Sequence, residues 1–287
     1  MFLGQPEEAL RDLTLSQDLC RIVDGLPRSE WGMLATLIHV SVTAIDLRAI
    51  AEGVRSHAWR EAQLAALQEQ LQKINFVSDI RKVMLTGPAR VSGFYPNATA
   101  FDLGIIYCGG LILSDDTNAW THLKATVVGG LIPRGWVYQK MVQQANGYMA
   151  LSESSDSAGQ IVYPRKVDAV AIMAKSHPST YNYLVRREGM YRNIARKQTQ
   201  VQEALVACAL ERYRLLHHEY PETLDALVPP FLAQVPRDLI GGQPLHYRRA
   251  DDGKFILYSI GWSGHDGGGV PGKTDVEGDW VWDNPPQ

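Results

Sequence analysis

The sequence predicts an α+β fold in which an all-helical N-terminal part is joined by one long helix to a small antiparallel sheet. Two observations predict it. Apolar residues recur at the three- and four-residue spacing of a half-buried helix through most of the N-terminal part. Beyond Gly241 the apolar period changes to that of a strand. We therefore expect a helical domain of unknown function over residues 1–187, and a long helix with a small sheet module over residues 188–287.

The composition is that of an ordinary globular protein. Of 287 residues, 45% are hydrophobic and 21% are charged, so the chain can bury a core. The net charge of −3 gives no basic excess, and we predict no nucleic-acid partner. Because Cys20, Cys108 and Cys208 are far apart and form no C-x-x-C pair, we interpret them as buried free thiols. One disulfide is the alternative in an exported chain.

No export signal is visible at the N-terminus. Met1 is followed by early acidic residues rather than by a basic segment and an apolar core, so no signal peptide is predicted. The best apolar stretch, Met33–Val42, is too short to cross a bilayer, and we predict no transmembrane segment in this chain. The chain is expected to be cytoplasmic as written, or to follow an export segment that lies upstream.

The first helices are predicted from their ends and from their apolar spacing. A proline followed by two acids begins a helix over 6–24, and a serine caps a second helix over 29–53. Apolar residues at helical spacing predict a third helix within 59–74. A similar face begins at Phe76 and is expected to end at Gly87-Pro88.

The middle of the chain is less regular. Residues 88–134 hold many glycines and prolines, and we predict mixed loops and short helices there. Residues 135–151 and 166–174 have helical patterns, and the polar run 152–159 between them predicts a surface loop. Pro178 is expected to end the second of these helices.

One long helix is predicted over 188–218, because no proline occurs between Glu188 and Pro221. Pro221 is itself typical of the first position of a helix, so a short helix is expected over 221–227. The prolines that follow predict an extended loop.

The sheet is predicted from its period and its turn. Alternating residues predict strands over 245–249 and 255–259, and Asp251-Asp252-Gly253 between them is a hairpin turn signal. A last short strand, 280–282, follows a glycine-rich loop. We expect Trp262, Trp280 and Trp282 to pack this sheet against the long helix, and an aromatic platform for sugar or peptide is the alternative.

The C-terminal segments occur in a familiar order and spacing. They are Ala209–Arg214, Tyr220-Pro221, Leu224–Leu227, Val235–Asp238, Gly242–Tyr247 and Phe255–Gly261, followed by a glycine-rich loop that ends in Asp279. This pattern resembles the soluble head of the type II secretion major pseudopilins over roughly residues 205–282. The rest of the chain lacks the prepilin cleavage site and the long apolar helix of that family. Its overall layout resembles a group of bacterial proteins of environmental and planctomycete type, a resemblance that implies no activity.

The resemblance implies a calcium site in the glycine-rich loop. Calcium takes carboxylate, carbonyl and water oxygens. Matched position by position, Ile260 and His265 would supply carbonyl oxygens and Asp279 a carboxylate. Ser263 stands where the family usually has an aspartate, and Asp266 or Asp275 could take its place. A bound ion would mainly stabilise the folded loop, and a solvated acidic turn without metal is the alternative.

Other motifs of catalysis are absent from the sequence. Gly261–His265 departs from the G-x-S-x-G nucleophile elbow at its last position. The His217-His218-Glu219 run is not an H-E-x-x-H zinc motif, because Glu222 stands where a second histidine would be needed. There is no P-loop and no dinucleotide-binding fingerprint.

These observations lead to two functional hypotheses. The first is an extracytoplasmic (periplasmic or secreted), non-enzymatic calcium-binding protein that makes contacts with other proteins through its pseudopilin-like module. The second is a calcium-dependent hydrolase of a small ester or lactone, such as an acyl-homoserine lactone. In that hypothesis a metal beside His265 activates water, and the helical domain supplies an apolar pocket.

Overall fold

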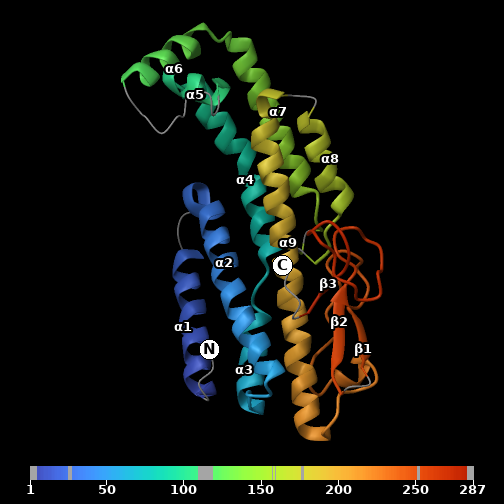
Figure 1. Cartoon of the computed structure of the whole chain (residues 1–287). Coiled ribbons are helices and arrows are strands. Elements are labelled where there is room, and N and C mark those ends of the chain that lie inside the picture. The colour runs from blue at the N-terminus through green and yellow to red at the C-terminus, as the bar shows by residue number, and fades with distance from the viewer. Residues whose placement is uncertain are drawn as a thin grey trace. The chain divides into compact units, whose positions relative to one another are not determined.

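The structure confirms the predicted α+β class. The computed structural model describes residues 5–24, 28–108, 119–156, 158, 160–175, 178–250 and 253–282. These residues are mostly helical, with a small antiparallel sheet near the C-terminal end (Figure 1). The helices are α1 (Pro6–Asp24), α2 (Arg28–Arg55), α3 (Glu61–Leu71), α4 (Phe76–Asn97), α5 (Ala100–Cys108), α6 (Ala119–Leu131), α7 (Arg134–Ser152), α8 (Pro164–Lys175) and α9 (Pro178–His217). A 3-10 turn, Leu224–Leu227, precedes the strands β1 (His246–Arg249), β2 (Phe255–Ser259) and β3 (Trp280–Val281).

The chain forms two compact units. Unit 1 comprises residues 1–83, 154–165 and 189–287, and unit 2 comprises residues 84–153 and 166–188. Helices α4 and α9 each contribute residues to both units. Helix α9 is continuous through the predicted domain boundary between residues 187 and 188, and the assignment of separate roles to the two sides stays a prediction.

The C-terminal half of α9 lies at the centre of the unit 1 core. Val206, Ala209 and Leu210 on this helix are fully buried. They pack with residues of the 3-10 turn, the following loop and the sheet, namely Tyr220, Leu224, Leu227, Leu232, Leu245 and Leu257. The small sheet is therefore held against the long helix by apolar burial, as the sequence predicts.

The sheet has the order β1-β2-β3 and is antiparallel throughout. His246 pairs with Tyr258 in the hairpin, and Ser259 pairs with Trp280 at the other edge of β2. The predicted hairpin is confirmed, whereas Asp251 and Asp252 of its turn lie outside the described residues. Trp262 and Trp280 are buried, with ring centroids 6.5 Å apart, which agrees with the packing interpretation of these tryptophans.

Two predicted helix ends are wrong, and both involve proline. Helix α4 continues through Pro88 to Asn97 instead of ending at Gly87-Pro88. A side chain at Gly87 would collide with the ring of Tyr148, so close packing of α7 on this glycine accompanies the continuous helix. Helix α9 begins at Pro178 rather than near residue 188, because proline at a first helical position costs no hydrogen bond.

The prediction of a helix over 221–227 is also wrong, since only the 3-10 turn Leu224–Leu227 forms there. The carbonyl oxygen of Pro221 accepts a hydrogen bond from the Tyr247 hydroxyl at 2.7 Å. That contact joins Pro221 to the sheet, so this carbonyl serves a tertiary contact rather than a helical turn.

Among the described residues, one helical segment, Gly32–Arg55 of α2, is long and apolar enough to cross a bilayer by length and composition alone. Asp46 on this segment is buried and accepts hydrogen bonds from Ser16 and Gln17 of α1, at 2.8 and 2.6 Å. In this arrangement α2 packs as a helix of the unit 1 core, and the absence of a transmembrane segment stays a prediction.

Candidate functional site

The predicted metal residues lie around the glycine-rich loop, but the side chains of Asp266, Asp275, Asp279 and Ser263 each have a protein partner. Asp279 is buried, with one carboxylate oxygen accepting the Gly267 N–H at 3.1 Å. Its other oxygen accepts the N–H groups of Gly269 at 2.6 Å and Val270 at 3.2 Å. Asp279 therefore fixes the conformation of the loop by accepting hydrogen bonds from its backbone N–H groups.

The other predicted ligands point to separate partners. Asp266 accepts hydrogen bonds from Gly268 N–H at 2.8 Å and from the Tyr258 hydroxyl at 3.1 Å. Those contacts, the backbone one foremost, lower the pKa of Asp266. Asp275 forms an ion pair with Arg196, and Ser263 Oγ accepts the N–H of His265 at 3.2 Å.

These contacts do not fit a preassembled calcium cage. The carboxylates of Asp266, Asp275 and Asp279 are all engaged by protein donors. No group of three or more His, Cys, Asp or Glu side chains that could hold a metal occurs among the described residues. Calcium binding at Ile260, Ser263, His265 and these acids stays a prediction.

A buried pair of acids lies beneath the start of the loop. Asp238 accepts hydrogen bonds from Ser259 Oγ at 2.8 Å and from the N–H of Ile260 at 3.0 Å. Glu203 on α9 is buried close to it, and neither of its carboxyl oxygens has a well-aligned hydrogen-bond partner among the described residues. Burial, reinforced by Asp238, raises the pKa of Glu203 well above its usual value.

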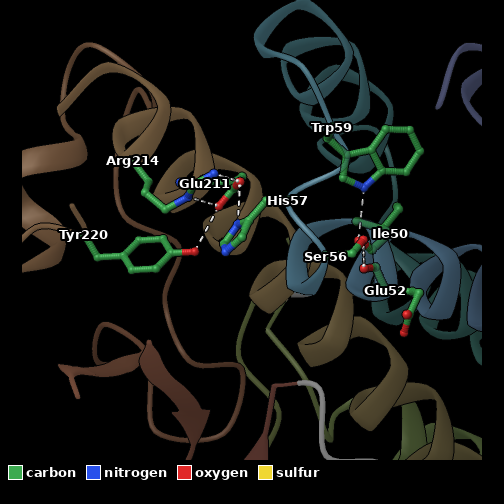
Figure 2. A network of polar contacts seen from close by, with 8 residues as sticks. All are labelled: Ile50, Glu52, Ser56, His57, Trp59, Glu211, Arg214 and Tyr220. Atoms are coloured by element: carbon green, nitrogen blue, oxygen red, sulfur yellow. Dashed lines mark hydrogen bonds and ion pairs between the residues drawn. The ribbon is translucent and has the colours of Figure 1, made fainter. Parts of the chain in front are cut away.

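Another buried acid, Glu211, has hydrogen-bond partners for both of its carboxylate oxygens (Figure 2). It accepts two hydrogen bonds from Arg214, at 2.9 and 2.7 Å, and one from the Tyr220 hydroxyl at 2.9 Å. The ring Nδ1 of His57 lies 3.0 Å from the same carboxylate. Burial alone would raise the pKa of Glu211, but these hydrogen bonds outweigh it and lower the pKa.

His57 is held toward Glu211 by an unusual local turn. It follows α2 with a positive φ of 53°, a conformation that few non-glycine residues adopt. The adjoining chain is fixed by Trp59, whose Nε1 donates to the Ile50 carbonyl at 3.2 Å, and by Ser56, whose hydroxyl donates to the Glu52 carbonyl at 2.8 Å (Figure 2).

His57 and Tyr220 line a cavity of about 440 Å³ in unit 1. Most of the wall is apolar or aromatic, and it comprises Val54, Phe255, Ile256, Val281 and Trp282 among others. Three basic side chains also reach it, namely Arg55, His57 and Lys254. A pocket of this size and composition is typical of a small-molecule site.

A second cavity, of about 360 Å³, adjoins the first and shares Ala51, Arg55 and Trp282 with it. It adds three cations, Arg48, Arg196 and Lys197, and three acids, Glu52, Glu203 and Asp275. Arg55 pairs with Glu52 at 2.6 Å, and Arg196 pairs with Asp275. Arg48 and Lys197 form no ion pair with a described residue, and burial, followed by Arg196 and Arg48, lowers the pKa of Lys197.

We name these two cavities the apolar cavity and the basic cavity. A further cavity of about 510 Å³ in unit 1 is lined largely by glutamine and aliphatic side chains and gathers one charged group, Arg237. Of the predicted metal residues only Asp275 lines the basic or the apolar cavity, through the Arg196 pair. Sequence reasoning missed His57, Glu211 and the cations, because they come from segments far apart in the chain.

The buried-thiol interpretation is confirmed for Cys20 and Cys208, which are buried and in no disulfide, whereas the side chain of Cys108 lies outside the described part of the structure. Comparison with protein-family models, curated proteins and solved structures finds no match to the chain. The pseudopilin resemblance stays a prediction.

Proposed function

We propose that unit 1 is a binding protein for a small amphipathic anion, a molecule with an apolar body and one carboxylate- or phosphate-type group. The observation that carries this proposal is the juxtaposition of the two cavities. The apolar cavity and the basic cavity share Arg55 and Trp282, so one ligand can contact aromatic walls at one end and cations at the other.

The charges of the basic cavity favour an anion. Arg55 and Arg196 are already paired with acids, whereas Arg48 and Lys197 form no ion pair within the described part of the chain. Lys197 is half-buried, with its Nζ donating to Gln200 Oε1 at 2.9 Å, and Arg48 is exposed. An entering anion would give both cations a counter-charge. Because the raised pKa of Glu203 favours its neutral form, this acid adds little opposing charge.

The apolar cavity supplies the rest of the binding energy. Burying a hydrocarbon chain yields roughly 25 cal/mol for each Å² removed from water, so even a short chain adds measurable affinity. Two aromatic side chains, Phe255 of the hairpin and Trp282 directly after β3, form part of this wall. We therefore expect the part of the ligand that enters the apolar cavity to be aliphatic or aromatic.

Calorimetric titration of the full chain with decanoate tests this function, with decanol as the uncharged match. We expect decanoate to bind and decanol to bind at least about tenfold more weakly. The double variant Arg48→Met, Lys197→Met should bind the two compounds with similar affinity. Arg11→Met on the exposed surface of α1 is the control and should behave as the wild type. Equal binding of decanoate by the double variant, or no binding of any amphipathic carboxylate or phosphate, would overturn the proposal.

One observation favours hydrolysis of a small ester or lactone as a second candidate. With Nδ1 directed at Glu211, His57 can use its other ring nitrogen to take a proton from water at the edge of the apolar cavity. Turnover that persists in EDTA and is lost in His57→Gln supports this function. Ligand binding without turnover supports the binding protein. The extracytoplasmic location and the contacts with other proteins stay predictions.

A further inference from the structure

Helix α6 of unit 2 leaves nearly all of its apolar surface exposed. Among the residues of Ala119–Leu131 whose burial the structure describes, Ala125 and Gly129 are buried. By contrast Trp120, Leu123, Val127 and Leu131 are between 52% and 78% exposed. Their three- and four-residue spacing puts them along one side of the helix, and we name them the α6 face.

Helices α5 and α6 approach each other most closely at small residues, beside the stacked rings of Phe101 and His122, whose centroids are 3.7 Å apart. Gly104 of α5 packs so closely on α6 that an added Cβ would lie 1.9 Å from the Ala125 carbonyl oxygen. An added Cβ on Gly129 would lie 1.6 Å from the carbonyl oxygen of Ala100. The two helices lie side by side with their backbones in near contact (Figure 1). Small residues between helices and large apolar residues outside are the arrangement of helices packed in lipid.

Helices α6 and α7 themselves carry cations and no acids, whereas Asp115 and Asp116 precede α6 in the sequence and Asp102 lies on α5. Residues 119–152 contain no Asp or Glu, and their formal charges are Lys124, Arg134 and Lys140, although the whole chain has a net charge of −3. Lys124 and Arg134 are exposed, and the Lys124 Nζ lies 5.2 Å from the centre of the Trp120 ring. An apolar helical face whose own helix carries a cation and no acid matches an anionic lipid surface.

Aromatic side chains flank this region. Trp120 begins the α6 face, and Trp136 near the start of α7 is 61% exposed. Tryptophan favours the boundary between lipid headgroups and acyl chains. With 13 residues, α6 is about 20 Å long, which is shorter than the roughly 30 Å hydrocarbon core of a bilayer. These lengths favour a helix lying in the interface over one that crosses the membrane.

We propose that the α6 face is a membrane-docking surface that inserts among the lipids of an anionic bilayer. Trp120, Leu123, Val127 and Leu131 enter the acyl boundary, while Lys124 and Arg134 contact headgroup phosphates. The proposal is independent of the ligand cavities, because every residue it uses lies in unit 2.

Flotation of the full chain with lipid vesicles tests the proposal. Vesicles of phosphatidylcholine alone are compared with vesicles that also contain phosphatidylglycerol, at low and at high sodium chloride. We expect flotation with the anionic vesicles, weaker flotation with the neutral ones, and a partial loss at high salt, because salt screens the charges but not the apolar insertion.

The triple variant Leu123→Ser, Val127→Ser, Leu131→Ser should lose binding by at least about tenfold. The matched control changes three similarly exposed residues of α1 in unit 1, as Leu15→Ser, Leu19→Ser, Ile22→Ser, and should float like the wild type. Circular dichroism of each variant establishes that the helices are retained. Lys124→Glu should weaken flotation with anionic vesicles and leave the neutral ones unchanged.

Two results would overturn the proposal. One is a wild-type chain that stays unbound with anionic vesicles at low salt, or a triple variant that floats equally well. The other is a lipid-free dimer, measured by light scattering after size-exclusion chromatography, that the triple variant converts to monomer. That second result would assign the α6 face to self-association.

Discussion

The Nδ1 atom of His57 lies 3.0 Å from Oε1 of Glu211, although the two residues are 154 positions apart in the chain. This contact joins the turn after α2 to the C-terminal part of α9. The same carboxylate also binds Arg214 and Tyr220, so one buried acid connects the N-terminal helices, the long helix and the segment that leads to the sheet.

We expect Glu211→Ala to lower the free energy of unfolding by about 3 kcal/mol, because it leaves a half-buried arginine and a buried tyrosine hydroxyl without their partner. Equilibrium urea unfolding measures this change. Glu69→Ala, on the exposed side of α3, is the control and should stay within about 0.5 kcal/mol of wild type. Similar effects of the two substitutions would show that the Glu211 network contributes little to folding.

The raised pKa of Glu203 predicts that the stability of the protein depends on pH. The pKa of this acid is raised in the folded state, so its contribution to stability is fully present below its ordinary value of 4.5 and is lost as the pH rises toward the folded-state pKa. Two charged groups act on this acid: Asp238 raises the pKa of Glu203, and Arg196 lowers it. We expect Glu203→Gln to be more stable than wild type at neutral pH by about 1–3 kcal/mol, with the gain shrinking toward pH 4.

Chemical unfolding of the two proteins across this pH range measures the effect. A constant difference between wild type and Glu203→Gln from acid to neutral pH would contradict the prediction.

The helices show where sequence periodicity is informative and where it fails. The ends of α1, α3 and α7 follow from local residues, and the structure places them within a few positions of the predicted ranges. The continuation of α4 through Pro88 could not be predicted, because it depends on the Tyr148 ring that packs on Gly87 from another helix. Tertiary packing overrides a local stop signal there.

The site was less accessible to prediction than the fold. Asp279 was singled out for the glycine-rich loop, but nothing local indicated that its oxygens would accept backbone N–H groups from Gly267, Gly269 and Val270. His57 and Glu211 carry no motif, and their meeting depends on how α2 and α9 pack. Residues that meet only through tertiary contacts leave no signal in a single sequence.

Asp279→Asn separates the structural role of the loop acid from calcium binding. The amide would set an N–H₂ group against backbone N–H donors, so we expect a loss of about 1–3 kcal/mol in EDTA, read from thermal melts. If the loop also binds calcium, millimolar calcium but not magnesium should raise the melting temperature of wild type and not of the variant. Asp225→Asn, at an exposed position, is the control. If calcium still raised the melting temperature of the Asp279→Asn variant, Asp279 would not be a calcium ligand.

Two neighbouring glycines of α6 give a matched test of the helix contact. A methyl group at Gly129 would collide with the backbone of α5, whereas one at Gly130 would meet no atom within 4 Å. Alanine is the better helix former by roughly 1 kcal/mol, so Gly130→Ala should stabilise unit 2 by up to that amount. Gly129→Ala must instead separate the two backbones, and we expect it to destabilise unit 2 by about 2 kcal/mol or more.

Amide hydrogen exchange resolved along the chain measures both variants, because it reports the opening of α5 and α6 separately from unit 1. Exchange in α5 and α6 should quicken in Gly129→Ala and stay equal or slow down in Gly130→Ala, with unit 1 unchanged in both. If Gly129→Ala exchanged like wild type, α5 and α6 would not be in backbone contact in solution. The small-residue packing used to infer a lipid environment would then lose its support, whereas the exposure and charge of the α6 face would still be tested by the vesicle experiment.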